Sequence, residues 1–131
     1  MKRMIFLMLL CLLAGSTVWG GEYQFISATD LKQRLERHEG LMLLDIQVET
    51  EFARHHIEGA VPTYAYPVKS ETDRSKLDAA VLQLAGHERP VVIVCPRGEG
   101  GAKRTYDYLL QKGVAEGRLA ILEGGQQGWP Y

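Results

Sequence analysis

Short apolar runs alternate along the chain with stretches in which apolar residues recur at helical spacing. The segments 41–46 and 90–95 are largely continuous apolar runs that are too short for buried helices. Runs of this kind are typical of parallel strands that are covered on both faces. We therefore predict an α/β domain with a central, mainly parallel sheet and helices on both faces.

The same pattern predicts five strands and the helices that connect them. The predicted strands are 23–26, 41–46, 60–65, 90–95 and 119–122, of which 60–65 is either an edge strand or an extended link. The predicted helices are one that begins after a capping Ser27 and ends near 38–40, followed by 50–55, 74–85 and 102–112. In the helix 74–85 we expect Leu77, Val81, Leu82 and Leu84 to face the core. At most one helical turn is expected within 123–129.

The first twenty residues differ from the rest of the chain. Lys2 and Arg3 precede an apolar run at 4–14, and small and turn-forming residues then continue to Gly20. This order is typical of a secretory signal peptide, and the run is shorter than the roughly 20 residues that cross a membrane. We therefore expect a signal peptide at 1–20 and one periplasmic or secreted domain at 21–131. Membrane attachment is expected only if the signal is not removed.

Composition and charge add two limits. The chain has 131 residues with 46% hydrophobic content, which is ordinary for a globular domain. Its formal net charge of −1 does not favour a nucleic-acid partner. Of the two cysteines, Cys11 lies in the expected signal peptide, so Cys95 would be the only thiol of the exported protein. A lone cysteine in an oxidising compartment is a candidate reactive thiol.

Cys95 ends one of the two central strands, and a glycine-rich segment follows it directly. Ligands of an open parallel sheet bind outside the carboxyl ends of the strands. A helix that begins after this segment would direct unpaired N–H groups and its positive dipole end toward Cys95. We therefore expect the sulfur to be held as a thiolate, with a pKa below the usual value of about 8.5. The alternative is that Cys95 is a small apolar core residue.

The segment after Cys95 is the expected anion-binding loop. Glycines allow its backbone amides to converge on one point without side chains in the way. Positive charge nearby comes from Arg97, Lys103 and Arg104, of which the last two are secondary candidates for binding. The expected site therefore consists of Cys95 as the nucleophile and of the loop residues Pro96, Arg97, Gly98, Glu99, Gly100 and Gly101.

Four motifs, in order and at matching distances, make the chain from Phe25 to Trp129 resemble the rhodanese family. The motifs are Leu43-Leu44-Asp45-Ile46, then Glu51-Phe52 with His56-Ile57-Glu58-Gly59-Ala60, then Val92-Ile93-Val94-Cys95 with its glycine loop, and finally Leu122-Glu123-Gly124-Gly125 leading to Gly128-Trp129. The resemblance implies a rhodanese-like α/β fold with a mainly parallel five-stranded sheet.

The resemblance also implies an activity, that of a sulfurtransferase of the thiosulfate sulfurtransferase type. Cys95 would take sulfane sulfur from thiosulfate or from a polysulfide or persulfide donor and become a persulfide. It would then pass that sulfur to a thiol or to cyanide, and the acceptor could also be a protein. No metal or organic cofactor is expected.

Two departures from the family pattern affect the expected anion binding. An arginine is frequent in the family shortly after the aspartate that Asp45 matches, whereas this chain has Gln47 there. The basic residue that is often found late in the active loop is replaced by Gly100 or Gly101. Anion binding would then depend on Arg97, Lys103 or Arg104.

Two other functions stay open on the sequence. One is a non-catalytic rhodanese-like module that binds a partner or senses sulfur or redox state. The other is a cysteine phosphatase or arsenate reductase, but these enzymes carry an arginine at the sixth position after the cysteine. That position is Gly101 here, so no arginine fixed in the loop could grip a tetrahedral oxyanion.

The other polar residues that stand out have structural interpretations. Asp45, at a strand end, is expected to accept backbone hydrogen bonds that fix the neighbouring loops. His56 is expected to orient a turn, and Trp129 to pack in the core. The remaining histidines have no metal-ligand spacing with Cys95, so no metal site is expected.

Overall fold

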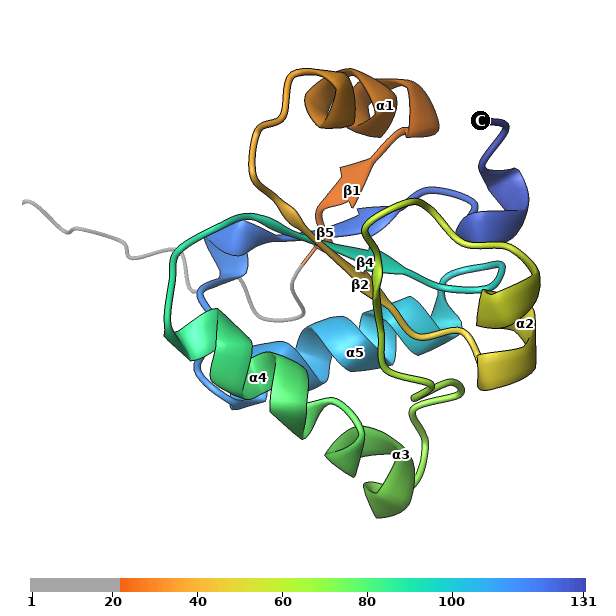
Figure 1. The fold of residues 1–131 in the computed structure, drawn as a ribbon. Coiled ribbons are helices and arrows are strands. Elements are labelled where there is room, and N and C mark those ends of the chain that lie inside the picture. Colours follow the sequence, from red (N-terminus) through yellow and green to blue (C-terminus); the bar gives the residue numbers. More distant parts are fainter. Residues whose placement is uncertain (1–21) are drawn as a thin grey trace, which may run out of the picture.

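The computed structural model describes residues 22–131, so the expected signal peptide at 1–20 lies outside the described residues. Among the residues that are described, no helix is both long and apolar enough to cross a membrane. The described chain folds around one central sheet, with its helices distributed over the two faces (Figure 1).

The sheet has five strands, and every neighbouring pair is parallel. The strands are β1 (Phe25–Ile26), β2 (Met42–Asp45), β3 (Val61–Pro62), β4 (Val91–Val94) and β5 (Leu119–Leu122). Their order across the sheet is β1-β5-β4-β2-β3, which places β4 in the middle. The predicted parallel α/β architecture is therefore confirmed, and its five strands fall within the five predicted segments.

Helices cover both faces of this sheet, as predicted. The helices are α1 (Ala28–Glu36), α2 (Glu49–Arg54), α3 (Glu71–Ser75), α4 (Asp78–Ala85) and α5 (Gly100–Gln111), with short 3-10 turns η1 (Glu116–Arg118) and η2 (Gln126–Gly128). Figure 1 shows α1 on one side of the sheet and α4 and α5 on the other. The start of α1 is fixed by Ser27, whose hydroxyl accepts a hydrogen bond from the Asp30 N–H at 3.1 Å.

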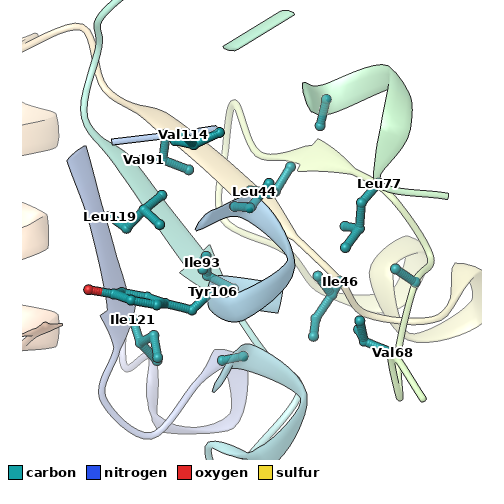
Figure 2. Close-up of a cluster of buried hydrophobic side chains, with 14 of the residues drawn as sticks. Leu44, Ile46, Val68, Leu77, Val91, Ile93, Tyr106, Val114, Leu119 and Ile121 are labelled. Carbon is teal, nitrogen blue, oxygen red and sulfur yellow. The ribbon is translucent and has the colours of Figure 1, made fainter. Parts of the chain in front are cut away.

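Successive residues of the central strands point to opposite faces and therefore enter two separate cores. Leu44 and Ile93 belong to the larger cluster, which packs against α4 and α5 (Figure 2). Leu43 and Val92 belong to the smaller cluster, which includes Leu31 of α1. A fully buried aliphatic side chain contributes about 1.5–3 kcal/mol of hydrophobic free energy, so the residues of the middle strands stabilise both cores.

The prediction of a single helix at 74–85 is wrong, because the structure has two helices there. Ser70 and Asp73 form a capping box that starts α3 earlier, at Glu71, and α4 begins only after the buried Leu77. Leu84 is buried as expected and Val81 is half-buried, but Leu82 is 76% exposed. The buried positions follow helical spacing around Leu84, and Leu82 falls on the opposite face of α4.

Candidate active site

Cys95 lies directly after β4, at the carboxyl edge of the middle of the sheet. The connection to α5 is shorter than the sequence predicts, because α5 begins at Gly100 rather than at 102. The Lys103 N–H donates to the Glu99 carbonyl at 2.8 Å and so closes the first helical turn over the two glycines. Gly100 and Gly101 are therefore residues of the first helical turn, and the loop itself is Pro96–Glu99.

Backbone N–H groups converge on the Cys95 sulfur. The N–H groups of Arg97, Gly101 and Ala102 lie around the sulfur and favour its charged form. In return, the thiol donates to the Arg97 carbonyl at 3.5 Å. The structure thus gathers the amides of one loop residue and of the first turn of α5 around a single sulfur atom, while Pro96 is buried and Arg97–Gly100 are exposed.

The expectation of a lowered thiol pKa is wrong for this structure. Cys95 exposes 0% of its surface, and this burial raises the pKa of the Cys95 thiol above its ordinary value. The three amides and the positive charge of Arg104 act in the opposite direction but do not outweigh the desolvation. The thiol is consequently the favoured form at neutral pH in this closed conformation.

The turn after β5 supports the loop from the other side. The Gln126 N–H donates to the Cys95 carbonyl at 2.7 Å, and the Gln127 N–H donates to the Pro96 carbonyl at 3.0 Å. Gly125 has φ 59°, and a Cβ there would lie 2.3 Å from the Cys95 carbonyl oxygen. Glycine is therefore required at this position for close backbone contact as well as for conformation.

The sequence pattern does not assign Gly124 and Gly125 to the site. The glycine pair after a strand was the available signal, since such pairs often mark a close backbone approach. The segment that it approaches is distant in the sequence, so the contact with Cys95 could be found only in the structure.

Asp45 organises the loop that follows β2, in agreement with its expected structural role. Its carboxylate is buried and accepts hydrogen bonds from the Gln47 N–H at 2.8 Å and from Gln47 Nε2 at 2.9 Å. Burial raises the pKa of the Asp45 carboxyl despite these hydrogen bonds. Gln47 Nε2 also donates to the His55 carbonyl at 3.2 Å, so the Gln47 side chain links the loop after β2 to the end of α2.

His56 holds the end of α2. Its Nδ1 lies 2.7 Å from the Phe52 carbonyl, and its ring stacks on Phe52 with centroids 3.9 Å apart. This geometry fits the expected orienting role. Within residues 22–131 there is no group of three metal-ligating side chains that could hold an ion. Trp129 is buried in the smaller core cluster, where it packs as expected.

The three basic residues near Cys95 have different surroundings. Lys103 pairs with Glu99, at 3.2 Å between Nζ and Oε2, and lies over the Tyr23 ring. Arg97 is exposed on the loop and lines a cavity of about 400 Å³ together with residues of α2 and of the C-terminal turn. Arg104 is half-buried, and its Nε donates to the Pro67 carbonyl at 2.9 Å.

The chain matches the family model described as "Rhodanese-like domain" over residues 27–130. This range contains the whole sheet except β1, together with every site residue described above. No match was found among curated proteins.

Solved structures show the same fold. The rhodanese-like domain of an Anabaena protein superposes with a TM-score of 0.63 at 22% identity, over 83% of this chain and 74% of that chain. A thiosulfate sulfurtransferase from Pseudomonas aeruginosa matches with a TM-score of 0.62 at 25% identity, and the match covers 82% of this chain but only 18% of that enzyme. A Rhodopseudomonas palustris protein of unknown function, described as a possible tyrosine phosphatase, matches with a TM-score of 0.59 at 16% identity, over 82% of this chain and 79% of that chain.

Proposed function

We propose, from the premise that this chain belongs to the rhodanese-like domain family, that it is a sulfurtransferase which carries sulfane sulfur on Cys95. The observation that carries the proposal is the environment of the Cys95 sulfur, at which the N–H groups of Arg97, Gly101 and Ala102 converge. The amides of Gly101 and Ala102 are held in the first turn of α5, and amides fixed in this way stabilise negative charge on sulfur. The donor is thiosulfate or a polysulfide or persulfide.

The first half-reaction is a displacement at sulfur, and thiosulfate serves as the example. The Cys95 thiolate attacks the outer, sulfane sulfur, and a new S–S bond forms as the S–S bond of thiosulfate breaks. Sulfite leaves with the electron pair of the broken bond, and Cys95 holds a persulfide with one negative charge. Charge is conserved, because a thiolate and a dianion give a persulfide anion and a dianion.

The second half-reaction regenerates the Cys95 thiolate. A thiol or cyanide acceptor attacks the outer persulfide sulfur, and the S–S bond breaks toward Cys95, which leaves as a thiolate. The amides that surround the inner sulfur favour this step because they stabilise the thiolate leaving group. This chemistry needs no metal or organic cofactor. The acceptor is a small molecule or a protein thiol, and the N-terminal pattern at 1–20 supports activity outside the cytoplasm.

Burial limits the first half-reaction in two ways. The raised pKa leaves little thiolate at neutral pH, and a sulfur with 0% exposure cannot be reached by a donor in line with the bond that forms. Sulfur transfer therefore requires the exposed stretch Arg97–Gly100 to open. Opening of this stretch exposes the sulfur to the donor. It also returns the sulfur to water, so the desolvation that raises the thiol pKa is removed.

A second candidate function is a non-catalytic rhodanese-like module that binds a partner or senses sulfur without turnover. The complete burial of Cys95 favours it. The phosphatase alternative has less support. Gly101 stands where such an enzyme carries its arginine, and the space beside Gly101 is filled by Tyr66 and Ile46.

An assay of the purified protein with thiosulfate and cyanide distinguishes these functions. The measured quantity is the rate at which thiocyanate forms. A sulfurtransferase forms thiocyanate, and Cys95→Ser abolishes its formation. Retained transfer in the Cys95→Ser variant would remove the proposed mechanism. Sulfur uptake without release would identify the binding or sensing module. Hydrolysis of an aryl phosphate without sulfur uptake would identify a phosphatase.

A further inference from the structure

The cavity of about 400 Å³ that Arg97 lines lies between the Cys95 loop, the end of α2 and the C-terminal turn. Arg97 connects this cavity to the sulfur. Its backbone N–H lies beside the sulfur and its carbonyl accepts from the Cys95 thiol at 3.5 Å, whereas its side chain lines the cavity. The loop backbone at Arg97 therefore lies between the cavity and the sulfur, and opening of the stretch Arg97–Gly100 would join the two spaces.

The wall that α2 contributes to this cavity carries a carboxylate without a partner. Glu51 is half-buried, and no basic side chain among residues 22–131 forms an ion pair with it. The neighbouring Gln47 is neutral, and its Nε2 already donates to Asp45 and to the His55 carbonyl. After burial, the charge of Glu51 also contributes to the raised pKa of the Asp45 carboxyl. A cation bound beside Glu51 would relieve this repulsion between two carboxylates.

Gln126 adds an unpaired hydrogen-bond acceptor to the same cavity. Its side chain is 5% exposed, and its Oε1 is buried without a hydrogen-bond partner in the described part of the chain. The other end of the amide, Nε2, lies 3.4 Å from Nδ1 of His55, which also lines the cavity. A buried oxygen that lacks a donor costs about 1–3 kcal/mol, so a ligand N–H that reached Oε1 would be favoured.

The outer rim of the cavity is positively charged. Arg54 and Arg97 both line it and are exposed, and neither pairs with a carboxylate among the residues that the structure describes. A ligand with a single charge would be attracted by one side of the cavity and repelled by the other. A zwitterion, with its ammonium group toward Glu51 and its carboxylate toward the two arginines, is complementary to both sides.

We infer that this cavity binds the sulfur acceptor, and that the acceptor is an α-amino-acid thiol of the cysteine type. This inference rests on the proposed sulfur transfer and names the class of its acceptor. The ammonium group of the acceptor faces Glu51 and Gln126, and its carboxylate faces the arginines of the rim. The outer sulfur of the Cys95 persulfide extends about 2 Å beyond Sγ, which shortens the path to the cavity once the loop is open.

The transfer step is balanced in atoms and in charge. The thiolate of the acceptor forms an S–S bond to the outer persulfide sulfur as the S–S bond to Cys95 breaks. Cys95 keeps the electron pair of the broken bond and becomes a thiolate, and the acceptor leaves as a persulfide. The total charge does not change.

The test isolates the second half-reaction. The protein is loaded with sulfur from thiosulfate or polysulfide, excess donor is removed, and the loss of the added sulfur to a thiol is followed by intact mass. The thiols are L-cysteine, cysteamine, which lacks the carboxylate, 3-mercaptopropionate, which lacks the ammonium group, and 2-mercaptoethanol, which lacks both. Rate constants are expressed per concentration of thiolate, so that different thiol pKa values do not decide the comparison. L-cysteine should react at least about fivefold faster than 2-mercaptoethanol.

Glu51→Gln gives the second readout. It should slow transfer to L-cysteine and to cysteamine by about 5- to 20-fold and change transfer to 2-mercaptoethanol by less than about twofold, because only the first two thiols carry an ammonium group. Glu49→Gln is the matched control, since Glu49 is an exposed carboxylate of the same helix that does not line the cavity. It should change transfer to each thiol by less than about twofold.

Equal rate constants for the four thiols in the unmodified protein would overturn the inference and leave the sulfurtransferase intact. Glu51→Gln that slows all four thiols alike, or none of them, would also overturn it. A protein that takes up no sulfur from either donor would overturn the proposed function. In that case an NMR titration with L-cysteine still decides whether the cavity binds this class of ligand, because Glu51→Gln should weaken binding and Glu49→Gln should not.

Discussion

At the scale of single residues, the chemistry of Cys95 is set by two opposing effects on one sulfur atom. Removal from water favours the neutral thiol, whereas three backbone N–H groups and Arg104 favour the thiolate. In the closed structure desolvation is the larger effect. The amides of Gly101 and Ala102 belong to α5, outside the stretch that opens, and would still stabilise charge on the sulfur after opening. The site therefore combines a protected resting thiol with amides that are already placed to stabilise the thiolate.

This balance predicts how the reaction depends on pH. A thiol whose pKa is raised is mostly protonated at neutral pH, so its thiolate fraction increases about tenfold per pH unit below that pKa. The rate of sulfur uptake from thiosulfate should therefore keep rising through the neutral range and level off only above the ordinary thiol range. Alkylation of Cys95 by iodoacetamide should show the same inflection. A rate that is already constant across the neutral range would show that the thiol pKa is not raised.

Gly125 provides a test of how the loop is supported. Gly125→Ala would place a methyl group against the Cys95 carbonyl at a residue with φ 59°, so the turn after β5 must move away from the loop. We expect a loss of at least about 2 kcal/mol in the free energy of unfolding and a strong loss of transferase activity.

The control for this change is Gly117→Ala. Gly117 has no positive φ, and a Cβ added there would meet no heavy atom within 4 Å, so the free energy of unfolding should change by less than about 0.5 kcal/mol. Urea unfolding of both variants measures the difference. Equal stability of the two variants would mean that the turn after β5 does not support the Cys95 loop.

At the scale of elements, the apolar pattern predicted the positions of the buried strands, because these depend on the local order of apolar and polar residues. The strands that carry Leu44 and Ile93 were recognisable because a continuous apolar run is characteristic of a strand buried on both faces. The start of α5 and the division between α3 and α4 could not be recognised in the sequence, because they depend on which backbone groups form hydrogen bonds. Glu99 closes the first turn of α5, and the capping box at Ser70 starts α3 early.

The two faces of α4 allow this correction to be tested. Leu84 is fully buried in the larger core cluster, whereas Leu82 on the same helix is 76% exposed. Leu84→Ala should lower the free energy of unfolding by about 2–5 kcal/mol, and Leu82→Ala, its matched control, should change it by no more than about 0.5 kcal/mol. Urea unfolding distinguishes them. Similar losses in both variants would mean that α4 packs on the sheet through a different face.

At the scale of the whole molecule, the parallel sheet brings the site together from distant parts of the chain. The ends of β2, β4 and β5 lie at one edge, and they carry Asp45, Cys95 and the Gly124-Gly125 turn. The sequence identified Cys95 and its loop, because their position after a central strand follows from the topology. It could not predict the burial of the sulfur, since that burial depends on packing between segments far apart in sequence.

The central claim is that this arrangement activates Cys95 to hold a transferable sulfur. Its most direct test is the intact mass of the purified protein after incubation with thiosulfate and removal of excess donor. We predict the addition of one sulfur atom to the unmodified protein, its loss on addition of cyanide, and no addition to the Cys95→Ser variant. An unmodified protein that gains no sulfur at any pH, or a Cys95→Ser variant that gains one, would contradict this claim.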